Sequence, residues 1–409
     1  MRIAMFTDRY YPDIDGISIH VHELCLALSK KGHAVVLYAP KPDDDNQQIQ
    51  TSEFIIRYIP CIPLPLAWDA RMAFPFSIEI LSEMKEFKAD VVHFHTPFMI
   101  GFQGVIAAKL LNIPLVGTFH TYFMEPEYLK RIGLDKMKLD KNEILHKVGW
   151  NYSNFFYDRA DIVISPSKYA RDDLIKNHLK AKIEVISNGI ECTIGKINSV
   201  FNLPERYFLY VGRMSKEKNI DELIEAFAQV SRNISDISLV LVGTGPEEKL
   251  VKKMIHTFQL EKRIVSLGQL AHEELVGSNI YRDALALVTT STSENQPISI
   301  LEGMKHGLPI VGVDARGVSE LIQGNGIVCS PHNIHEFAEA LEKIALDKKL
   351  YSRFKAKSLR LLQKHSFDYT TLKLEELYER SSKIKEKRVS GHLHPKQFLE
   401  EVLIKMKNF

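Results

Sequence analysis

The chain has 409 residues, 45% of them hydrophobic, and a formal net charge of +2 at pH 7. This length exceeds what one hydrophobic core usually organises, so we expect two domains. The nearly balanced charge gives no basic surface of the kind that binds nucleic acids, and we expect no nucleic-acid partner. Widely spaced cysteines without a CxxC pair indicate a reducing compartment: Cys25, Cys61, Cys192 and Cys329.

The N-terminal residues predict a cytoplasmic protein. Residues 1–6 form a short apolar strand that leads directly into folded sequence, without the charged and apolar regions of a signal peptide. The longest apolar stretch, residues 99–111, falls short of the roughly 20 residues that a membrane-spanning helix needs. We therefore expect any membrane contact to be peripheral.

Short apolar strands and amphipathic helices alternate through the first half of the chain. Residues 2–6 and 34–39 predict strands with a helix between them, which gives a βαβ opening. Strands that are apolar throughout are typical of parallel sheets buried on both faces. Further strands of this type are predicted at residues 90–96, 114–120, 161–165 and 183–186.

The alternation begins again after a polar stretch at residues 190–204. We therefore expect two Rossmann-like α/β domains, residues 1–190 and 191–375, followed by a helical tail of residues 376–409 that returns toward the first domain. In the second domain, strands are predicted at residues 207–212, 238–242, 264–267, 284–289 and 309–313, with helices near 220–230 and 247–255 and three more after Asn333.

A cationic loop follows the first predicted strand of the second domain. Arg213 and Lys218 come after residues 207–212, and ligands of open α/β sheets bind beyond the carboxyl ends of the strands. A guanidinium can grip two phosphate oxygens at once and a lysine adds a point charge, so this loop suits a diphosphate. The alternative is a solvated loop with ordinary surface ion pairs.

Two glutamates flank the start of a helix later in the same domain. Glu294 precedes the helix, Pro297 fits its first turn, and Glu302 lies inside it. The N–H groups of Ile298 and Ser299 would point at a bound diphosphate. Carboxylate oxygens accept hydrogen bonds from vicinal hydroxyls, so one glutamate could hold a sugar and the other a ribose.

The first domain carries a turn glycine and several histidines at predicted strand ends. Gly16 would let an anion approach the N-terminus of the following helix, although a turn glycine without a ligand is as plausible. His93 and His95 lie on one face of a strand end and His120 follows another strand, so three imidazoles could converge on a metal ion. Strand-end histidines more often hydrogen-bond a polar ligand, which is the interpretation we prefer.

These residues resemble those of a family 4 glycosyltransferase with the GT-B fold. That family carries a glutamate, seven intervening residues and a second glutamate, as Glu294 and Glu302 are arranged. It also spaces an arginine and a lysine as Arg213 and Lys218 are spaced. The resemblance extends over nearly the whole chain and includes the Gly16 loop, His120 and the Gly243-Thr-Gly-Pro246 stretch.

The resemblance implies two domains that face each other across a cleft, the first binding an acceptor and the second a nucleotide diphosphate sugar. It assigns the diphosphate to Arg213 and Lys218, the ribose to Glu302 and the donor sugar hydroxyls to Glu294, with His120 near the anomeric carbon. The family retains the anomeric configuration and usually needs no metal, so we expect no cofactor besides the nucleotide sugar. The expected catalytic residues are His120, Glu294, Arg213 and Lys218, and further donor-binding residues are Gly16, Gly243, Asn295, Gln296, Pro297, Ile298 and Ser299.

Segments of the first domain look similar to those of the diacylglycerol glucosyltransferases within this family. Residues 129–150 mix cations with aromatic and aliphatic side chains, which suits an anionic membrane surface and, equally, an ordinary amphipathic helix. The final amphipathic segment, residues 397–409, could also contact a membrane. The expected function is transfer of a hexose, glucose from UDP-glucose, to a membrane lipid such as diacylglycerol, with His20, His95 and Tyr122 binding the acceptor.

Other functions remain open at this point. A sugar, a polysaccharide or a small metabolite as acceptor is the runner-up. The same fold also serves nucleotide-sugar epimerases, and a non-catalytic nucleotide-sugar binder is a further alternative.

Overall fold

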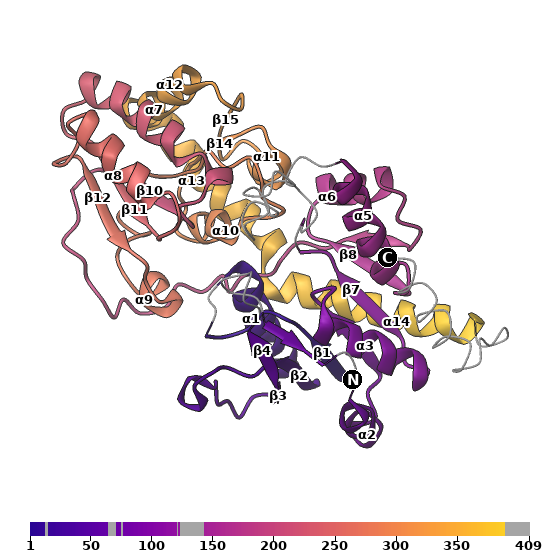
Figure 1. The fold of residues 1–409 in the computed structure, drawn as a ribbon. Coiled ribbons are helices and arrows are strands. Elements are labelled where there is room, and N and C mark those ends of the chain that lie inside the picture. Colours follow the sequence, from indigo (N-terminus) through magenta and orange to yellow (C-terminus); the bar gives the residue numbers. More distant parts are fainter. Residues whose placement is uncertain (13–14, 64–70, 75–76, 121, 123–142, 389–409) are drawn as a thin grey trace. The chain divides into compact units, whose positions relative to one another are not determined.

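The structure is a computed structural model in which the chain forms two units (Figure 1). Unit 1 comprises Met1–Ser187 and the chain from Thr370 onward, and unit 2 comprises Asn188–Tyr369. Each unit has its own hydrophobic core around a parallel sheet. The structure describes residues 1–12, 15–63, 71–74, 77–120, 122 and 143–388.

The unit boundaries lie slightly earlier in the chain than the sequence analysis placed them. The chain leaves unit 1 after Ser187 and returns to it at Thr370, whereas the predicted domains ended at residues 190 and 375. The hydroxyl of Thr370 donates a hydrogen bond to the carbonyl oxygen of Ser187 (3.2 Å), so the return to unit 1 begins near the start of the last helix.

Unit 1 is built on a seven-stranded sheet with the order β3-β2-β1-β6-β7-β8-β9, in which all neighbouring strands run parallel. The inner strands β6, β7 and β8 are buried along their whole length, as their apolar sequences predict. A separate antiparallel pair joins β4 to β5. The strands are β1 (Arg2–Phe6), β2 (Ala34–Pro40), β3 (Ile55–Ile59), β4 (Cys61–Pro63), β5 (Arg71–Ala73), β6 (Val91–Phe94), β7 (Leu115–Thr118), β8 (Ile162–Ser165) and β9 (Ile183–Val185).

The last helix of the described chain, α14 (Phe367–Arg388), returns to unit 1, as the sequence predicted. Its Glu375 accepts hydrogen bonds from Lys31 (3.1 Å) and pairs with His33 (2.7 Å). Residues 397–409 lie outside the described part of the chain. The other helices of unit 1 are α1 (Gly16–Lys30), α2 (Ile78–Phe87), α3 (Met99–Leu110), α5 (Glu143–Tyr157) and α6 (Lys168–Lys176).

Helix α5 contains the described end of the candidate membrane segment 129–150. Trp150 in this helix is 5% exposed and stacks on Phe119 with ring centroids 6.3 Å apart, so this aromatic packs into the core of unit 1. Residues 129–142 lie outside the described part of the chain. None of the described helices is both long enough and apolar enough to span a membrane.

Unit 2 is built on a six-stranded parallel sheet with the order β12-β11-β10-β13-β14-β15. Its strands are β10 (Tyr207–Val211), β11 (Ser238–Val242), β12 (Ile264–Gly268), β13 (Ala286–Val288), β14 (Ile310–Val313) and β15 (Gly326–Cys329). Its helices are α7 (Ile220–Asn233), α8 (Glu248–Thr257), α9 (His272–Val276), α10 (Ile298–Lys305), α11 (Arg316–Leu321), α12 (Ile334–Leu346) and α13 (Lys348–Leu362).

Two strands that the sequence analysis did not predict lie at sheet edges. In β3 the exposure alternates along the strand, and Ile55 is 43% exposed. In β15 only the last residue, Cys329, is fully buried. Because an edge strand packs on fewer neighbours, it does not need the continuous apolar run by which inner strands are recognised.

Each sheet has one point at which the strand order reverses. In unit 1 this point lies between β1 and β6, and in unit 2 it lies between β10 and β13. Loops diverge on either side of such a point, and ligands of open α/β sheets bind there, beyond the carboxyl ends of the strands. The predicted site residues follow these strands, because His95 comes directly after β6 and Arg213 comes shortly after β10.

Candidate active site

In unit 2, the loops that follow β10 and β13 are joined by hydrogen bonds. The hydroxyl of Thr290 donates to the carbonyl oxygens of Lys218 (3.0 Å) and Asn219 (2.8 Å). The side-chain amide of Asn219 donates to the carbonyl of Thr290 (3.1 Å) and to the hydroxyl of Thr292 (3.2 Å). Asn219 has a φ of 49°, a left-handed conformation that asparagine tolerates better than most residues. The two loops are therefore held as one polar surface.

This surface brings two of the predicted catalytic residues together. Lys218 donates a hydrogen bond to Oε1 of Glu294, and the two side chains are 15% and 22% exposed. Lys218 belongs to the short 3-10 helix Lys216–Lys218, and Arg213 lies in the same loop, where its carbonyl accepts a hydrogen bond from the hydroxyl of Tyr210 (3.0 Å). The geometry thus places at least one cation and one carboxylate in contact at the reversal point.

Gly243 has a structural reason to be glycine apart from the predicted donor contact. It has a φ of +129°, and a Cβ atom there would lie 2.0 Å from the carbonyl oxygen of Gly212. The loop after β11 therefore approaches the loop after β10 at the level of the backbone. The N–H of Met214 completes this approach by donating to the carbonyl of Thr244 (2.8 Å).

The start of helix α10 lies at the same edge of the sheet. Pro297 is its N-terminal flanking residue and is buried, one position before the first turn in which the sequence analysis placed it. Within the described chain, no side chain caps this helix, so its first N–H groups, which include those of Ile298 and Ser299, suit an anion. Gln296, by contrast, uses its side-chain oxygen to accept a hydrogen bond from the N–H of Asn188 (2.6 Å).

A residue that the sequence analysis missed fixes the loop before α10. Gly317 in α11 donates its N–H to the carbonyl of Glu294 (3.0 Å). A Cβ atom at Gly317 would lie 1.7 Å from the carbonyl oxygen of Asn295, so only glycine allows this contact. The backbone that carries Glu294 and Asn295 is therefore positioned by α11.

Glu302, inside α10, is held on both of its carboxylate oxygens. Oε1 pairs with Nε2 of His272 (2.7 Å), and Oε2 accepts a hydrogen bond from the hydroxyl of Tyr281. Glu302 is 5% exposed, and burial together with this carboxylate raises the pKa of Tyr281 well above its ordinary value, so the tyrosine stays protonated and donates. Neither His272 nor Tyr281 was predicted, because their contact with Glu302 depends on the tertiary fold.

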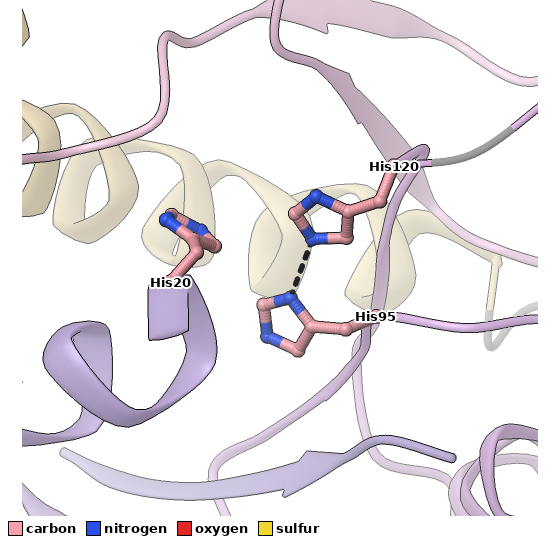
Figure 2. Close-up of side chains that lie close together, drawn as sticks. All are labelled: His20, His95 and His120. Carbon is pink, nitrogen blue, oxygen red and sulfur yellow. Dashed lines mark hydrogen bonds between the residues drawn. The ribbon is translucent and has the colours of Figure 1, made fainter. Parts of the chain in front are cut away.

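In unit 1, three predicted histidines meet at the carboxyl ends of the strands. His20 lies in α1, His95 directly follows β6, and His120 follows β7 (Figure 2). A hydrogen bond joins Nδ1 of His95 to Nε2 of His120 (3.0 Å), and the ring of His20 lies 5.2 Å from that of His120, centroid to centroid. The structure thus brings together His20 and His95, predicted for the acceptor, and His120, predicted for the anomeric carbon.

His93 does not belong to this cluster in the way that the sequence analysis considered. Its two ring nitrogens are engaged by the hydroxyls of Tyr378 (2.8 Å) and Thr118 (2.7 Å), so the convergence of His93, His95 and His120 on a metal ion was wrong in its choice of His93. Burial lowers the pKa of His20 to about 4 and that of His93 to about 3. It also lowers the pKa values of His95 and His120 well below the ordinary value, so all these rings are neutral near pH 7.

The predicted anion site at Gly16 has a different partner in the structure. Asp15 caps α1, and its carboxylate accepts hydrogen bonds from the N–H groups of Ile17 (3.0 Å) and Ser18 (2.9 Å). A bound anion would have to displace this carboxylate. Gly16 itself is exposed.

Two further residues of unit 1 complete this part of the site. Tyr122, predicted to bind the acceptor, is 6% exposed and packs edge-on against Phe119, with ring centroids 5.1 Å apart. Asp8, which the sequence analysis did not single out, accepts hydrogen bonds from the hydroxyl of Thr96 (2.6 Å) and the N–H of Ile100 (2.6 Å). Its position directly after β1 was the available signal, since such positions line ligand sites in this class of fold.

Comparison with known proteins identifies relatives over most of the chain. An alpha-monoglucosyldiacylglycerol synthase from Streptococcus pneumoniae is 28% identical over 354 residues, which cover 83% of this chain and 77% of the relative. A second alpha-monoglucosyldiacylglycerol synthase, from Acholeplasma laidlawii, is 27% identical over 76% of this chain and 80% of its own length. A GDP-mannose-dependent alpha-mannosyltransferase from Corynebacterium glutamicum is 24% identical over 86% of this chain and 82% of its own.

A solved structure shares the fold. HepE from Anabaena in complex with UDP-glucose superposes with a TM-score of 0.70 at 19% identity, covering 93% of this chain and all of that chain (100%). The predicted fold class is confirmed, with two parallel-sheet α/β units of the GT-B type. Two family models match consecutive parts of the chain, Glycosyltransferase Family 4 over residues 14–193 and Glycosyl transferases group 1 over residues 196–360. The chain therefore belongs to the family 4/group 1 glycosyltransferases.

Proposed function

We propose that this glycosyltransferase transfers a hexose, glucose from UDP-glucose, to a membrane lipid such as diacylglycerol, with retention of the anomeric configuration. Two relatives that match over more than three-quarters of the chain are alpha-monoglucosyldiacylglycerol synthases, which supports a glucosyl donor and a lipid acceptor. The reaction would take place at the cytoplasmic face of a membrane. The observation that carries the assignment of the donor site is the contact of Lys218 with Glu294 beside the uncapped start of α10.

The donor diphosphate would bind at the reversal point of the sheet in unit 2. Arg213 and Lys218 supply cations in the loop after β10, and the N–H groups of Ile298 and Ser299 lie at the positive end of α10. In the transition state the sugar gains oxocarbenium character while negative charge develops on the departing diphosphate. Fixed positive groups at the phosphates stabilise this charge as it forms.

The rest of the donor would be bound by the two glutamates and the loop between them. Glu302 would accept hydrogen bonds from the ribose, and Glu294 from the sugar hydroxyls, with Asn295 lining the pocket. Glu302 keeps acceptor capacity for this role because each carboxylate oxygen accepts more than one hydrogen bond. Since the protein supplies the positive charge, we propose that the chemistry needs no metal ion.

The acceptor would interact with unit 1. His20, His95 and His120 are buried and neutral, so they can donate or accept hydrogen bonds with a hydroxyl without carrying charge. We assign His120 to the anomeric region and His20 and His95 to the acceptor. In same-face substitution the departing phosphate takes the acceptor proton, so no nucleophilic carboxylate is required.

A different donor or acceptor is the second candidate. The GDP-mannose-dependent relative matches a similar share of this chain, which leaves a mannosyl donor open. A soluble sugar or polysaccharide acceptor, an epimerase and a non-catalytic nucleotide-sugar binder are less well supported, because two relatives carry lipid-glycosylating names.

The test is release of nucleoside diphosphate from UDP-glucose and GDP-mannose, with and without vesicles that contain diacylglycerol, followed by mass analysis of the lipids. We expect release that requires UDP-glucose and the vesicles, and a lipid product heavier by one hexose. Lys218→Ala should abolish release, whereas Lys216→Ala, an exposed lysine of the same 3-10 helix, should retain it. Release without vesicles would contradict the lipid acceptor, and release from GDP-mannose alone would contradict the glucosyl donor.

A further inference from the structure

The three histidines of unit 1 form a cluster with the spacing of a metal site. His20, His95 and His120 each offer a ring nitrogen, and these atoms all lie within 4.8 Å of one another. The side chains come from α1 and from the segments after β6 and β7, and they turn toward one another (Figure 2). Three imidazoles with one open position are the ligand set of many zinc sites that also bind water or a substrate.

We infer that these three histidines bind one divalent ion of the zinc class, and that the bound ion inhibits the enzyme. Nitrogen ligands of this kind suit zinc, copper, nickel and cobalt better than magnesium or calcium, which prefer oxygen. The ion would be a reversible ligand of unit 1 and would play no part in the transfer step.

The distance between two of the ligands is close to what zinc requires. Nδ1 of His95 and Nε2 of His120 lie 3.0 Å apart. Two nitrogens on one tetrahedral zinc ion, each about 2.05 Å from it, are separated by about 3.3 Å. The pair thus needs to open by only a few tenths of an ångström, and the side chain of His20 needs to turn toward it.

His95 offers the ion a lone pair from either ring nitrogen. Its Nδ1 already faces His120, and its Nε2 is buried without a hydrogen-bond partner among the described residues. A buried polar atom of this kind is costly unless something binds it. Burial also keeps the rings of the cluster neutral near pH 7, so no proton has to leave before the metal binds.

His93 restricts the site to these three ligands. Its ring lies 4.2 Å from that of His95, centroid to centroid, but its nitrogens are engaged by Tyr378 and Thr118. It therefore packs beside His95 as part of the wall of the site. Packing of this kind restricts the orientation of a metal-binding ring.

Inhibition follows because the same imidazoles are assigned to the acceptor and to the anomeric region. An ion that occupies them removes their hydrogen bonds to substrate and places positive charge where an oxocarbenium-like sugar would form. This consequence rests on the proposed function, whereas binding of the ion does not.

The binding test uses the full chain without a polyhistidine tag, stripped of metal with a chelator and then desalted. Cobalt(II) is titrated while visible absorption is recorded, and zinc affinity is measured by competition with a chromophoric chelator. We expect one tightly bound ion per chain, with the intense bands of tetrahedral cobalt that zinc then displaces. His20→Ala and His95→Ala should each weaken binding at least tenfold, and His256→Ala, which removes an exposed histidine of unit 2, should not change it.

X-ray absorption of the zinc-loaded wild-type protein provides a readout that does not depend on the folding of any variant. Three imidazole ligands would support the proposal. Absence of a tight equivalent in the wild type, fewer than two imidazoles at the zinc, or equal affinity in wild type and correctly folded His20→Ala would overturn it.

The functional arm measures release of nucleoside diphosphate from UDP-glucose with diacylglycerol vesicles. Zinc at one equivalent should reduce release at least tenfold, and a chelator should restore it. Unchanged release with the site loaded would overturn the inhibitory role. If the ion binds but no donor and acceptor support release in its absence, the proposed function fails while the metal site stands.

Discussion

Replacement of Tyr281 by phenylalanine removes one of the two donors that hold Glu302. The tyrosine is fully buried, and its hydroxyl donates to Oε2 of a carboxylate that is only 5% exposed. A hydrogen bond to a charged group contributes about 1.5–3 kcal/mol to stability. We expect the free energy of unfolding of unit 2 to fall by an amount in this range, because no water can replace the lost donor at a buried oxygen without rearrangement.

The same substitution should weaken nucleotide binding. If Glu302 accepts hydrogen bonds from the ribose, loss of its orientation should cost about 1.4 kcal/mol or more, which is a tenfold rise in the dissociation constant for UDP. Tyr207→Phe is the matched control, because the hydroxyl of Tyr207 is buried in the same unit but donates to the neutral carbonyl of Ile280 (2.6 Å). This control should lose about 0.5–1.5 kcal/mol of stability and keep the wild-type affinity for UDP.

Stability of unit 2 has to be measured by hydrogen exchange in peptides from α10 or by calorimetry that resolves the two units. Both tryptophans, Trp68 and Trp150, precede residue 188, so their fluorescence does not report on unit 2. UDP affinity is measured by titration calorimetry. Equal loss of UDP affinity in Tyr281→Phe and Tyr207→Phe, or no loss in either, would refute the reasoning that Tyr281 acts through Glu302.

Two further predictions follow from the packing and from the pKa shifts. Gly317→Ala should lower UDP-glucose affinity at least tenfold without loss of secondary structure by circular dichroism, because the new Cβ atom would lie 1.7 Å from the carbonyl oxygen of Asn295; wild-type affinity would contradict this. Unit 1 should lose stability as the pH falls from 6.5 toward 4, because burial lowers the pKa of His20 to about 4 and of His93 to about 3, so the unfolded chain binds protons there that the folded chain does not. Asp8→Asn should make this loss steeper, because burial raises the pKa of Asp8 from 3.8 to about 6 and its contribution grows as the pH falls; tryptophan fluorescence during chemical unfolding would show equal pH slopes if this is wrong.

The strand ends and their order could be predicted from the sequence because they depend on local patterns. The apolar runs at β6 and β7 are continuous, so their carboxyl ends, and with them His95 and His120, could be placed at one edge of a sheet. The edge strands β3 and β15 were missed because their partly exposed residues leave no such run.

Side-chain partners that come from distant segments could not be predicted. His93 and His95 are equivalent in the sequence pattern, yet Tyr378 in α14 engages His93, and His20 takes its place beside His95 and His120. Tyr378 is 285 positions away along the chain, so no local signal connects it with His93. The pairing of Glu302 with Tyr281 likewise depends on packing in unit 2.

The central claim is that the contact of Lys218 with Glu294 marks the diphosphate-sugar site. The measurement that tests it most directly is the affinity for UDP, by titration calorimetry, of wild type, Lys218→Met and Glu294→Gln. Lys218→Met removes the cation and should weaken UDP at least tenfold, which is about 1.4 kcal/mol. Glu294→Gln removes a carboxylate that competes with the diphosphate for Lys218, so UDP should bind as tightly as in wild type or more tightly, while release of UDP from UDP-glucose falls. Unchanged UDP affinity in Lys218→Met, or equal weakening in both variants, would contradict the account.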